Sequence, residues 1–169
     1  MTACYLIAAV VIALDQATKA LALDRLDPSE PVRVLGGLVH LDLTWNSGAA
    51  FSMFTDYTWV LAIVAGAVVV FLIVLARRIV YPSWAIALGL VLGGAAGNLV
   101  DRLLREPGFG QGHVIDFISV FKPDAEVFPI FNLADSSLVC GVILLVLLEL
   151  TGRGFSPAAR AGSRREGEK

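Results

Sequence analysis

Long apolar stretches alternate with short polar segments along this chain. The stretch from Trp59 to Ala76 contains no charged residue and ends at Arg77-Arg78, and a second one runs from Trp84 to Val100. The stretches nearer the two ends are shorter and reach spanning length only by including a few polar residues. A helix that crosses a bilayer needs about 20 residues. The pattern predicts four membrane-spanning helices, at about residues 3–23, 57–76, 83–104 and 132–150.

The composition supports a membrane protein and excludes several other classes. Hydrophobic residues make up 57% of the 169 residues and charged residues 17%, whereas soluble domains contain about 45–50% apolar and about 25% charged residues. Mean hydropathy is +0.76 and the net charge is −2. A disordered chain, a basic nucleic-acid binder and a disulfide scaffold are therefore excluded. We interpret Cys4 and Cys140, which lie in apolar runs, as packing residues.

The distribution of basic residues predicts which side of the membrane each loop faces. Seven basic residues lie in the turn at 77–78 and after residue 152, against five on the opposite side. Because basic loops stay in the cytoplasm, we expect both termini there and extracytoplasmic loops at 24–56 and 105–131. We also expect a single integral membrane domain over residues 1–152 and a disordered basic tail over residues 153–169.

The two long loops carry different signals. In the first loop, apolar and polar residues alternate from Val39 to Trp45, which predicts a strand with one apolar face. Asn46-Ser47-Gly48 predicts a turn after it, and Ala49-Ala50-Phe51 then leads back toward the bilayer. The second loop contains the glycine-rich segment 107–112, which suits either a lid over a site or a plain connector.

Polar side chains in the spans gather at one end of the predicted bundle. Ionisable groups inside a membrane are energetically costly and therefore indicate a functional site. Asp15 and Lys19 are four residues apart and share a helix face, and Asn132 shares a face with Asp135 in the same way. Because successive spans alternate in direction, these groups reach the outer end together. The third span brings a further group to that end: Gly94, Asn98, Asp101 and Arg102.

The residue types in this layer favour a pair of carboxyl groups over other catalytic groups. A serine or cysteine nucleophile needs a base, and the chain has only two histidines, His40 and His113, both in loops. A metal site made of His113, Asp116 and Asp135 would lack a second histidine or cysteine to complete it. Two aspartates that share a proton, in contrast, can activate water and protonate a leaving nitrogen.

Asp116 and Asp135 are the best-placed candidates for such a pair. Asp135 begins a predicted helix, whose dipole favours the charged form, whereas apolar neighbours of Asp116 favour its neutral form. In a coupled pair the roles of acid and base belong to the pair and not to either residue. Asp101 is an alternative, but the adjacent Arg102 offers it a structural partner.

Five sequence blocks occur in order within residues 5–150: Asp15-Gln-Ala-Thr-Lys19, Asn46-Ser-Gly-Ala-Ala-Phe51, Gly93-Gly-Ala-Ala-Gly-Asn-Leu-Val-Asp-Arg102, Val114-Ile-Asp-Phe117 and Phe131-Asn-Leu-Ala-Asp-Ser136. Together they resemble the motifs of bacterial lipoprotein signal peptidase (signal peptidase II), a family of aspartic intramembrane peptidases. The resemblance implies a mainly α membrane protein, a four-transmembrane-helix bundle with a small extracytoplasmic β-cradle and a short interfacial helix. It also implies a location in the bacterial inner membrane.

The resemblance further implies an activity and its partners. Members of the family remove the signal peptide from diacylglyceryl-modified prolipoproteins, cutting on the N-terminal side of the lipidated cysteine in the bilayer plane. No cofactor, metal or nucleic acid is implied. The implied partners are these precursors, membrane lipids and the peptide antibiotic globomycin, and we expect a monomer.

The resemblance also assigns roles to individual residues. It makes Asp116 and Asp135 the catalytic pair. The positions that line or support the pocket are Asn46, Gly48, Gly94, Asn98, Arg102 and Asn132, and the supporting polar network contains Asp15, Lys19 and Asp101. A small transporter or proton channel and a structural membrane subunit are the alternatives. The concentration of polar groups at one end, and not through the full thickness, argues against both.

Overall fold

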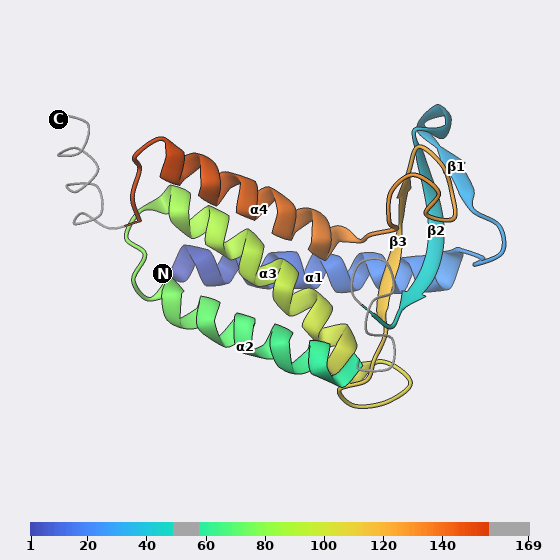
Figure 1. Ribbon diagram of the computed structural model, residues 1–169, viewed down its shortest axis with the longest axis horizontal. Coiled ribbons are helices and arrows are strands. Elements are labelled where there is room, and N and C mark those ends of the chain that lie inside the picture. Colours follow the sequence, from blue (N-terminus) through green and yellow to red (C-terminus); the bar gives the residue numbers. More distant parts are fainter. Residues whose placement is uncertain (49–57, 156–169) are drawn as a thin grey trace.

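The computed structural model describes residues 1–48 and 58–155 of the chain. Within these ranges it contains four long helices, α1 (Thr2–Arg25), α2 (Thr58–Ala76), α3 (Pro82–Leu104) and α4 (Leu133–Leu150). The helices run along one another, and a small sheet lies across one end of the bundle, away from the N-terminus and the end of α4 (Figure 1). Each helix is long and apolar enough to cross a membrane.

The predicted fold class is confirmed. Each helix begins and ends within two residues of the range that the apolar stretches predict, and the sheet is antiparallel with three strands. Outside the four spans, the helical segment among the described residues is a three-residue 3-10 turn, η1 (Leu35–Gly37). The predicted return of the chain at 49–51, and most of the predicted tail, lie outside the described residues.

Helix α3 is the centre of the bundle, and small residues let its neighbours approach it closely. It packs against α1, α2 and α4. A Cβ atom added at Gly93 would lie 2.6 Å from Cβ of Val11 in α1, and one added at Gly141 in α4 would lie 2.8 Å from the carbonyl oxygen of Ala87. Glycines at these crossings therefore set the distance between the backbones.

The outer faces of the bundle are apolar, as lipid contact requires. Large apolar side chains are exposed along the helices, among them Leu6, Val10, Ile63, Phe71, Ile143 and Leu147. Lipid tails are as apolar as these side chains, so the exposure is not costly in a bilayer. The described polar groups with buried side chains lie instead toward the end of the bundle that carries the sheet.

The sheet is fastened to the end of α1 by one of its faces. Strands β1 (Val32–Val34), β2 (Val39–Asn46) and β3 (Val114–Val120) pair in the order β1-β2-β3, and β2 matches the predicted strand. Leu43 of β2 packs with Ile115 of β3 on Ala22 of α1. Because side chains alternate along a strand, the paired residues Thr44 and Asp116 lie on the opposite face.

The close crossing of α3 and α4 can be tested at Gly141. We expect Gly141→Ala to destabilise the protein in detergent by about 1–3 kcal/mol, because the new methyl group has no space and overpacking costs that much. Gly66→Ala is the matched control, since nothing lies within 4 Å of a Cβ atom at Gly66 in α2. The measurement is the midpoint of thermal unfolding. Equal midpoints for the two variants would contradict this packing.

Candidate active site

One asparagine, Asn132, joins both candidate acids. It is fully buried and is the N-cap of α4. Its Oδ1 accepts the backbone N–H of Asp135 at 3.0 Å, while Oδ2 of Asp135 accepts the backbone N–H of Asn132 at 3.1 Å. Its Nδ2 donates to Oδ1 of Asp116 at 2.6 Å. This reciprocal capping box fixes Asp135 at the start of the helix and brings Asp116 to the same residue.

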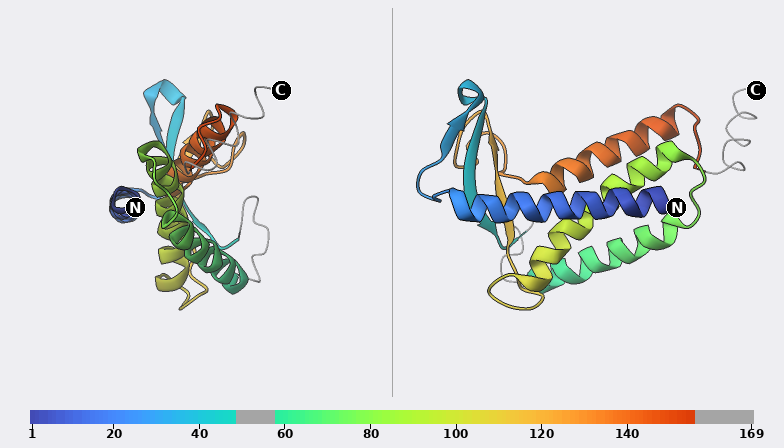
Figure 2. Two further views of the ribbon diagram at one scale, coloured as in Figure 1. Left: turned by 90° about the vertical axis from the view of Figure 1, so that its left-hand side faces the viewer. Right: turned by 180° about the vertical axis from the view of Figure 1, so that it is seen from behind.

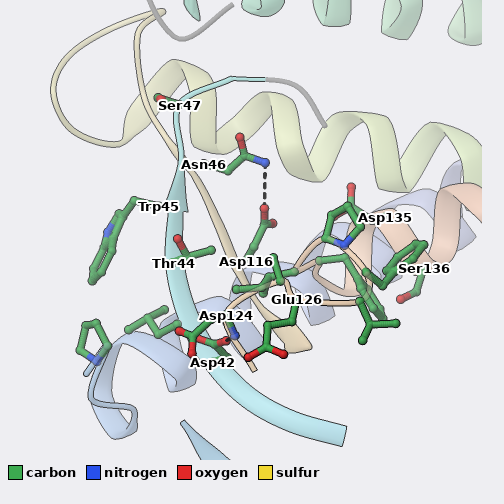
Figure 3. Close-up of a pocket in the computed structure, with 18 of the residues that line it drawn as sticks. Asp42, Thr44, Trp45, Asn46, Ser47, Asp116, Asp124, Glu126, Asp135 and Ser136 are labelled. Carbon is green, nitrogen blue, oxygen red and sulfur yellow. Dashed lines mark hydrogen bonds between the residues drawn. The ribbon is translucent and has the colours of Figure 1, made fainter. Parts of the chain in front are cut away.

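Asp116 projects from β3 and is 2% exposed. Its Oδ2 accepts a second hydrogen bond, 2.9 Å long, from Nδ2 of Asn46 at the end of β2 (Figure 3). Burial raises the pKa of Asp116 to about 7, and the nearby charge of Asp135 raises it as well. The hydrogen bonds from Asn46 and Asn132 and the charge of Lys19 act in the opposite direction. Asp116 therefore exchanges its proton near neutral pH.

Asp135 is held from the side of α3 by Asn98. Nδ2 of Asn98 donates to Oδ1 of Asp135 at 2.7 Å. Oδ1 of Asn98 accepts from Nδ2 of Asn132 at 3.1 Å and from Nζ of Lys19 at 3.0 Å. Asn98 therefore has its orientation fixed on both sides, since its oxygen faces two donors and its nitrogen faces a carboxylate.

A buried ion network lies behind the two candidate acids. Nζ of Lys19 contacts Asp15 at 2.8 Å and Asp101 at 2.7 Å, and all three side chains are fully buried. With Asn98 as the third acceptor, the ammonium group uses each of its three donors. The pairing of Asp15 with Lys19 follows the four-residue spacing.

Asp15 also acts on α4. Its Oδ1 accepts the backbone N–H of Ala134 at 3.0 Å, at the first turn of that helix. The first N–H groups of a helix have no partner within it, and a negative charge is favourable there. The network therefore positions the helix end that carries Asp135.

Asp101 is paired differently from the expectation. Its partners are Lys19 and Arg105, whose Nε lies 2.6 Å from Oδ1, and not the adjacent Arg102. The reason is the helix period: residue 105 is one turn beyond 101 on the same face, whereas neighbours in sequence point about 100° apart. Gln16 donates a further hydrogen bond to Asp101 at 3.0 Å.

Arg102 lies within electrostatic range of Asp116 and Asp135, although it forms no salt bridge with either among the described residues. It is 8% exposed, its Nη2 donates to the carbonyl oxygen of Gly48 at 2.7 Å, and its Nη1 has no hydrogen-bond partner among the described residues. The bond to Gly48 fastens the turn after β2 to the end of α3. Gly94, one helical turn before Asn98, lies against α4, where a Cβ atom would approach Leu138 to 3.0 Å.

A pocket of about 1100 Å³ opens beside these groups. Asn46, Asp116 and Asp135 line this pocket, and residues 124–131 form another part of its wall. Asp42 of β2 holds that wall, since its buried carboxylate accepts the backbone N–H of Asp124 at 2.6 Å. Figure 3 shows Asp42, Asp124 and Glu126 close to one another on the side of the pocket away from Asn46.

Within the described ranges, no group of three or more histidine, cysteine, aspartate or glutamate side chains is arranged to hold a metal ion. His113 does not join Asp116 and Asp135 in such a group. The alternative metal site considered from the sequence therefore has no geometric support. Among the described residues that line the pocket, the polar side chains are mainly carboxyls, with the hydroxyls of Thr44, Ser47 and Ser136 and the amide of Asn46.

Three residues of the site were not singled out from the sequence. Arg105 was within reach, because it lies four residues after Asp101. Gln16 follows Asp15 directly and gave no signal of its own. Asp42 lies in the alternating strand and was interpreted only as its polar face. Its contact with Asp124 joins residues 82 positions apart, which local patterns do not reveal.

Comparison with known proteins gives one family. The family model described as signal peptidase (SPase) II matches residues 7–151. The lipoprotein signal peptidase of Mycolicibacterium smegmatis is 53% identical over 162 residues, which cover 96% of this chain and 66% of that protein, slightly less than two thirds of its length. The lipoprotein signal peptidase of Mycobacterium avium is 51% identical over 154 residues, covering 91% of this chain and 82% of that protein.

Solved structures agree with this result. A bacterial membrane enzyme determined at 2.3 Å resolution has a TM-score of 0.78 and 28% sequence identity to this chain, and the match covers 91% of each. A second bacterial membrane enzyme, determined at 1.9 Å resolution, has a TM-score of 0.73 and 29% identity over 89% of this chain and 94% of that one.

The raised pKa of Asp116 predicts how stability depends on pH. An aspartate in the unfolded chain titrates near about pH 3.9, so between that pH and about 7 the folded protein holds a proton that the unfolded chain has released. The contribution of Asp116 to stability therefore falls as the pH rises through this window, by at most about 1.4 kcal/mol per pH unit, and levels off above it.

Asp116→Asn replaces the titrating carboxyl group with a neutral amide. Comparison with this variant therefore isolates the contribution of Asp116 to the pH dependence of stability. Unfolding midpoints of both proteins are measured in detergent from pH 4 to 8. We expect the midpoint of the natural protein to fall relative to that of the variant as the pH rises to about 7. A difference that stays constant over this range would mean that Asp116 has an ordinary pKa. The pH-independent loss from the altered hydrogen bonds does not affect this comparison.

Proposed function

The chain belongs to the signal peptidase II family, and on this premise we propose that it is an aspartic endopeptidase acting on diacylglyceryl-modified prolipoproteins. In this proposal it cuts on the N-terminal side of the lipidated cysteine, in the plane of the bilayer. Residues 1–152 form the peptidase domain. Asp116 and Asp135 are the catalytic pair. The observation that carries the proposal is that both carboxyl groups bind the same buried asparagine, Asn132, beside a large pocket.

The pair works as one acid and one base. One proton is held between the two carboxyl groups, because two like charges so close to one buried residue are not both favourable. The ionised carboxyl takes a proton from water, whose oxygen then bonds to the carbonyl carbon of the scissile peptide. The protonated carboxyl donates its proton to the leaving nitrogen, and the carbon–nitrogen bond breaks. The proton taken from water restores the pair for the next cycle.

The residues around the pair supply orientation and charge. We propose that Asn46 and Asn98 hold the two carboxyl groups and that the Nη1 atom of Arg102 faces the substrate. Gly94 allows the backbone of α3 to approach α4 closely, and the carbonyl oxygen of Gly48 holds the guanidinium of Arg102. Asp15, Lys19 and Asp101 position these elements from behind.

The position of the pocket suits a substrate that is anchored in lipid. It lies where the helices meet the sheet, and its lining includes Val139 and Cys140 on the exposed face of α4. A lipidated precursor can approach this face without leaving the bilayer. Globomycin, a peptide antibiotic, is proposed to occupy the same pocket, and the protein is proposed to act as a monomer with both termini in the cytoplasm of a bacterial cell.

Substituting either acid tests the mechanism. We expect Asp116→Asn and Asp135→Asn each to lower the rate of cleavage of a lipid-modified precursor peptide by about 10²–10⁴-fold, since each removes one half of the acid–base pair. The measurement is a gel-shift assay of the purified protein in detergent. The unfolding midpoint of each variant, recorded in parallel, separates a loss of chemistry from a loss of folding.

The matched control is Asp24→Asn. Asp24 is an exposed aspartate at the sheet end of α1 that pairs with Arg25 and does not line the pocket. We expect this variant to cleave at the rate of the natural protein. Full activity in either the Asp116 or the Asp135 variant would refute the proposed pair.

The proposed orientation is tested by labelling cysteines in intact cells. In a Cys140→Ala background, where the remaining Cys4 is buried, we expect Glu30→Cys to react with a membrane-impermeant maleimide added outside. Arg78→Cys, in the exposed turn between α2 and α3, should react only after the cells are broken. The opposite pattern would place the sheet in the cytoplasm.

A further inference from the structure

The turn between β1 and β2 carries large apolar side chains that the rest of the protein does not cover. Leu35 is 75% exposed and Leu38 is 54% exposed. Seen along the helices from the end that carries the N-terminus, the β1–β2 hairpin projects sideways from α1 and α3 (Figure 2, left). The turn that carries these two residues therefore lies to the side of α1 and α3 in this view.

Phe121 extends this apolar surface from a neighbouring strand. Its side chain is 58% exposed, and its backbone N–H donates to the carbonyl oxygen of Leu38 at 2.8 Å. We refer to Leu35, Leu38 and Phe121 together as the hairpin patch. Clusters of exposed apolar residues mark sites of contact with another protein or with a membrane.

The backbone of the turn adds to the argument. Leu35 has φ 47°, a left-handed conformation that is unfavourable for a residue with a side chain, and Gly36 and Gly37 follow with φ 69° and 97°. In water, both the strained backbone and the exposed leucine would be unfavourable. Burial of the leucine side chain in an apolar phase is favourable, and this gain compensates for the strain of the backbone.

The charges near the turn are those of a lipid interface. Residues 31–41 contain no acidic residue. Arg33 is exposed, and its Nη2 donates to the carbonyl oxygen of Gly36 at 2.6 Å, beside the apolar tip. Arginine next to exposed leucine and phenylalanine is typical of segments that lie in the headgroup region, where the apolar part is buried and the cation meets phosphate.

We propose that the hairpin patch inserts into the outer boundary of the bilayer and anchors the sheet there. The occupant is lipid, because the sheet lies at the end of four helices that are long and apolar enough to cross a membrane, and the hairpin projects sideways from α1 and α3. Phe121 begins the segment that continues into residues 124–131, which form part of the pocket wall. The anchor therefore sets the position of that wall relative to the membrane.

The test measures the surroundings of the patch directly and does not depend on catalysis. Leu35→Cys and Leu38→Cys are made in the Cys140→Ala background, labelled with a nitroxide and reconstituted in lipid nanodiscs. Glu30→Cys, on the polar segment before β1, is the matched control. Collisions of each label with oxygen, which concentrates in lipid, and with a water-soluble nickel chelate are measured by electron paramagnetic resonance.

We expect the ratio of oxygen to nickel-chelate accessibility to be several-fold higher at positions 35 and 38 than at position 30. A ratio at both tip positions equal to that at position 30 would mean that the tip lies in water, which overturns the proposal. Labels shielded from both reagents would place the tip against protein, such as a second copy of the chain, and would overturn it as well.

Discussion

The buried ammonium group of Lys19 is the contact on which the arrangement of the site depends. Its three acceptors lie on α1 and α3, and two of them, Asp15 and Asn98, also form hydrogen bonds with α4. Asp15 accepts the backbone N–H of Ala134 in the first turn of α4, and Asn98 holds Asp135. The two carboxylates that contact Lys19 are balanced by Lys19 itself and by Arg105. Breaking such a buried pair costs about 3–5 kcal/mol, so the network keeps the helix ends in register.

The start of α4 serves both folding and the proposed chemistry. A helix needs partners for its first N–H groups, and Asn132 and Asp135 provide them for each other. The same two side chains also face Asp116 and Asn98. The position of one candidate acid is therefore fixed by the backbone geometry of a helix terminus, which is more rigid than a loop. Asp116 gains comparable rigidity from its pairing between strands and the bond to Asn46.

The sequence predicts the parts of this structure that depend on local patterns. Apolar length determines the spans, and alternation determines β2, because each pattern repeats within a single element. Strand β3 is buried at five of its seven positions, so it shows no alternation. Strand β1 has only three residues. The partner of Asp101 and the contact from Asp42 to Asp124 depend on how distant segments meet, which neighbouring residues do not specify.

The donors that surround the candidate pair are consistent with a shared proton. Asp116 and Asp135 receive their hydrogen bonds from asparagine groups, two each: Asn46 and Asn132 for the first, and Asn98 and the backbone of Asn132 for the second. Among the described residues, neither acid takes part in a salt bridge. A cation in direct contact would favour the ionised form of both carboxyl groups and remove the proton that the proposed hydrolysis needs. Neutral amides orient the carboxyl groups without that strong bias, and Lys19 stays one residue away, behind Asn98.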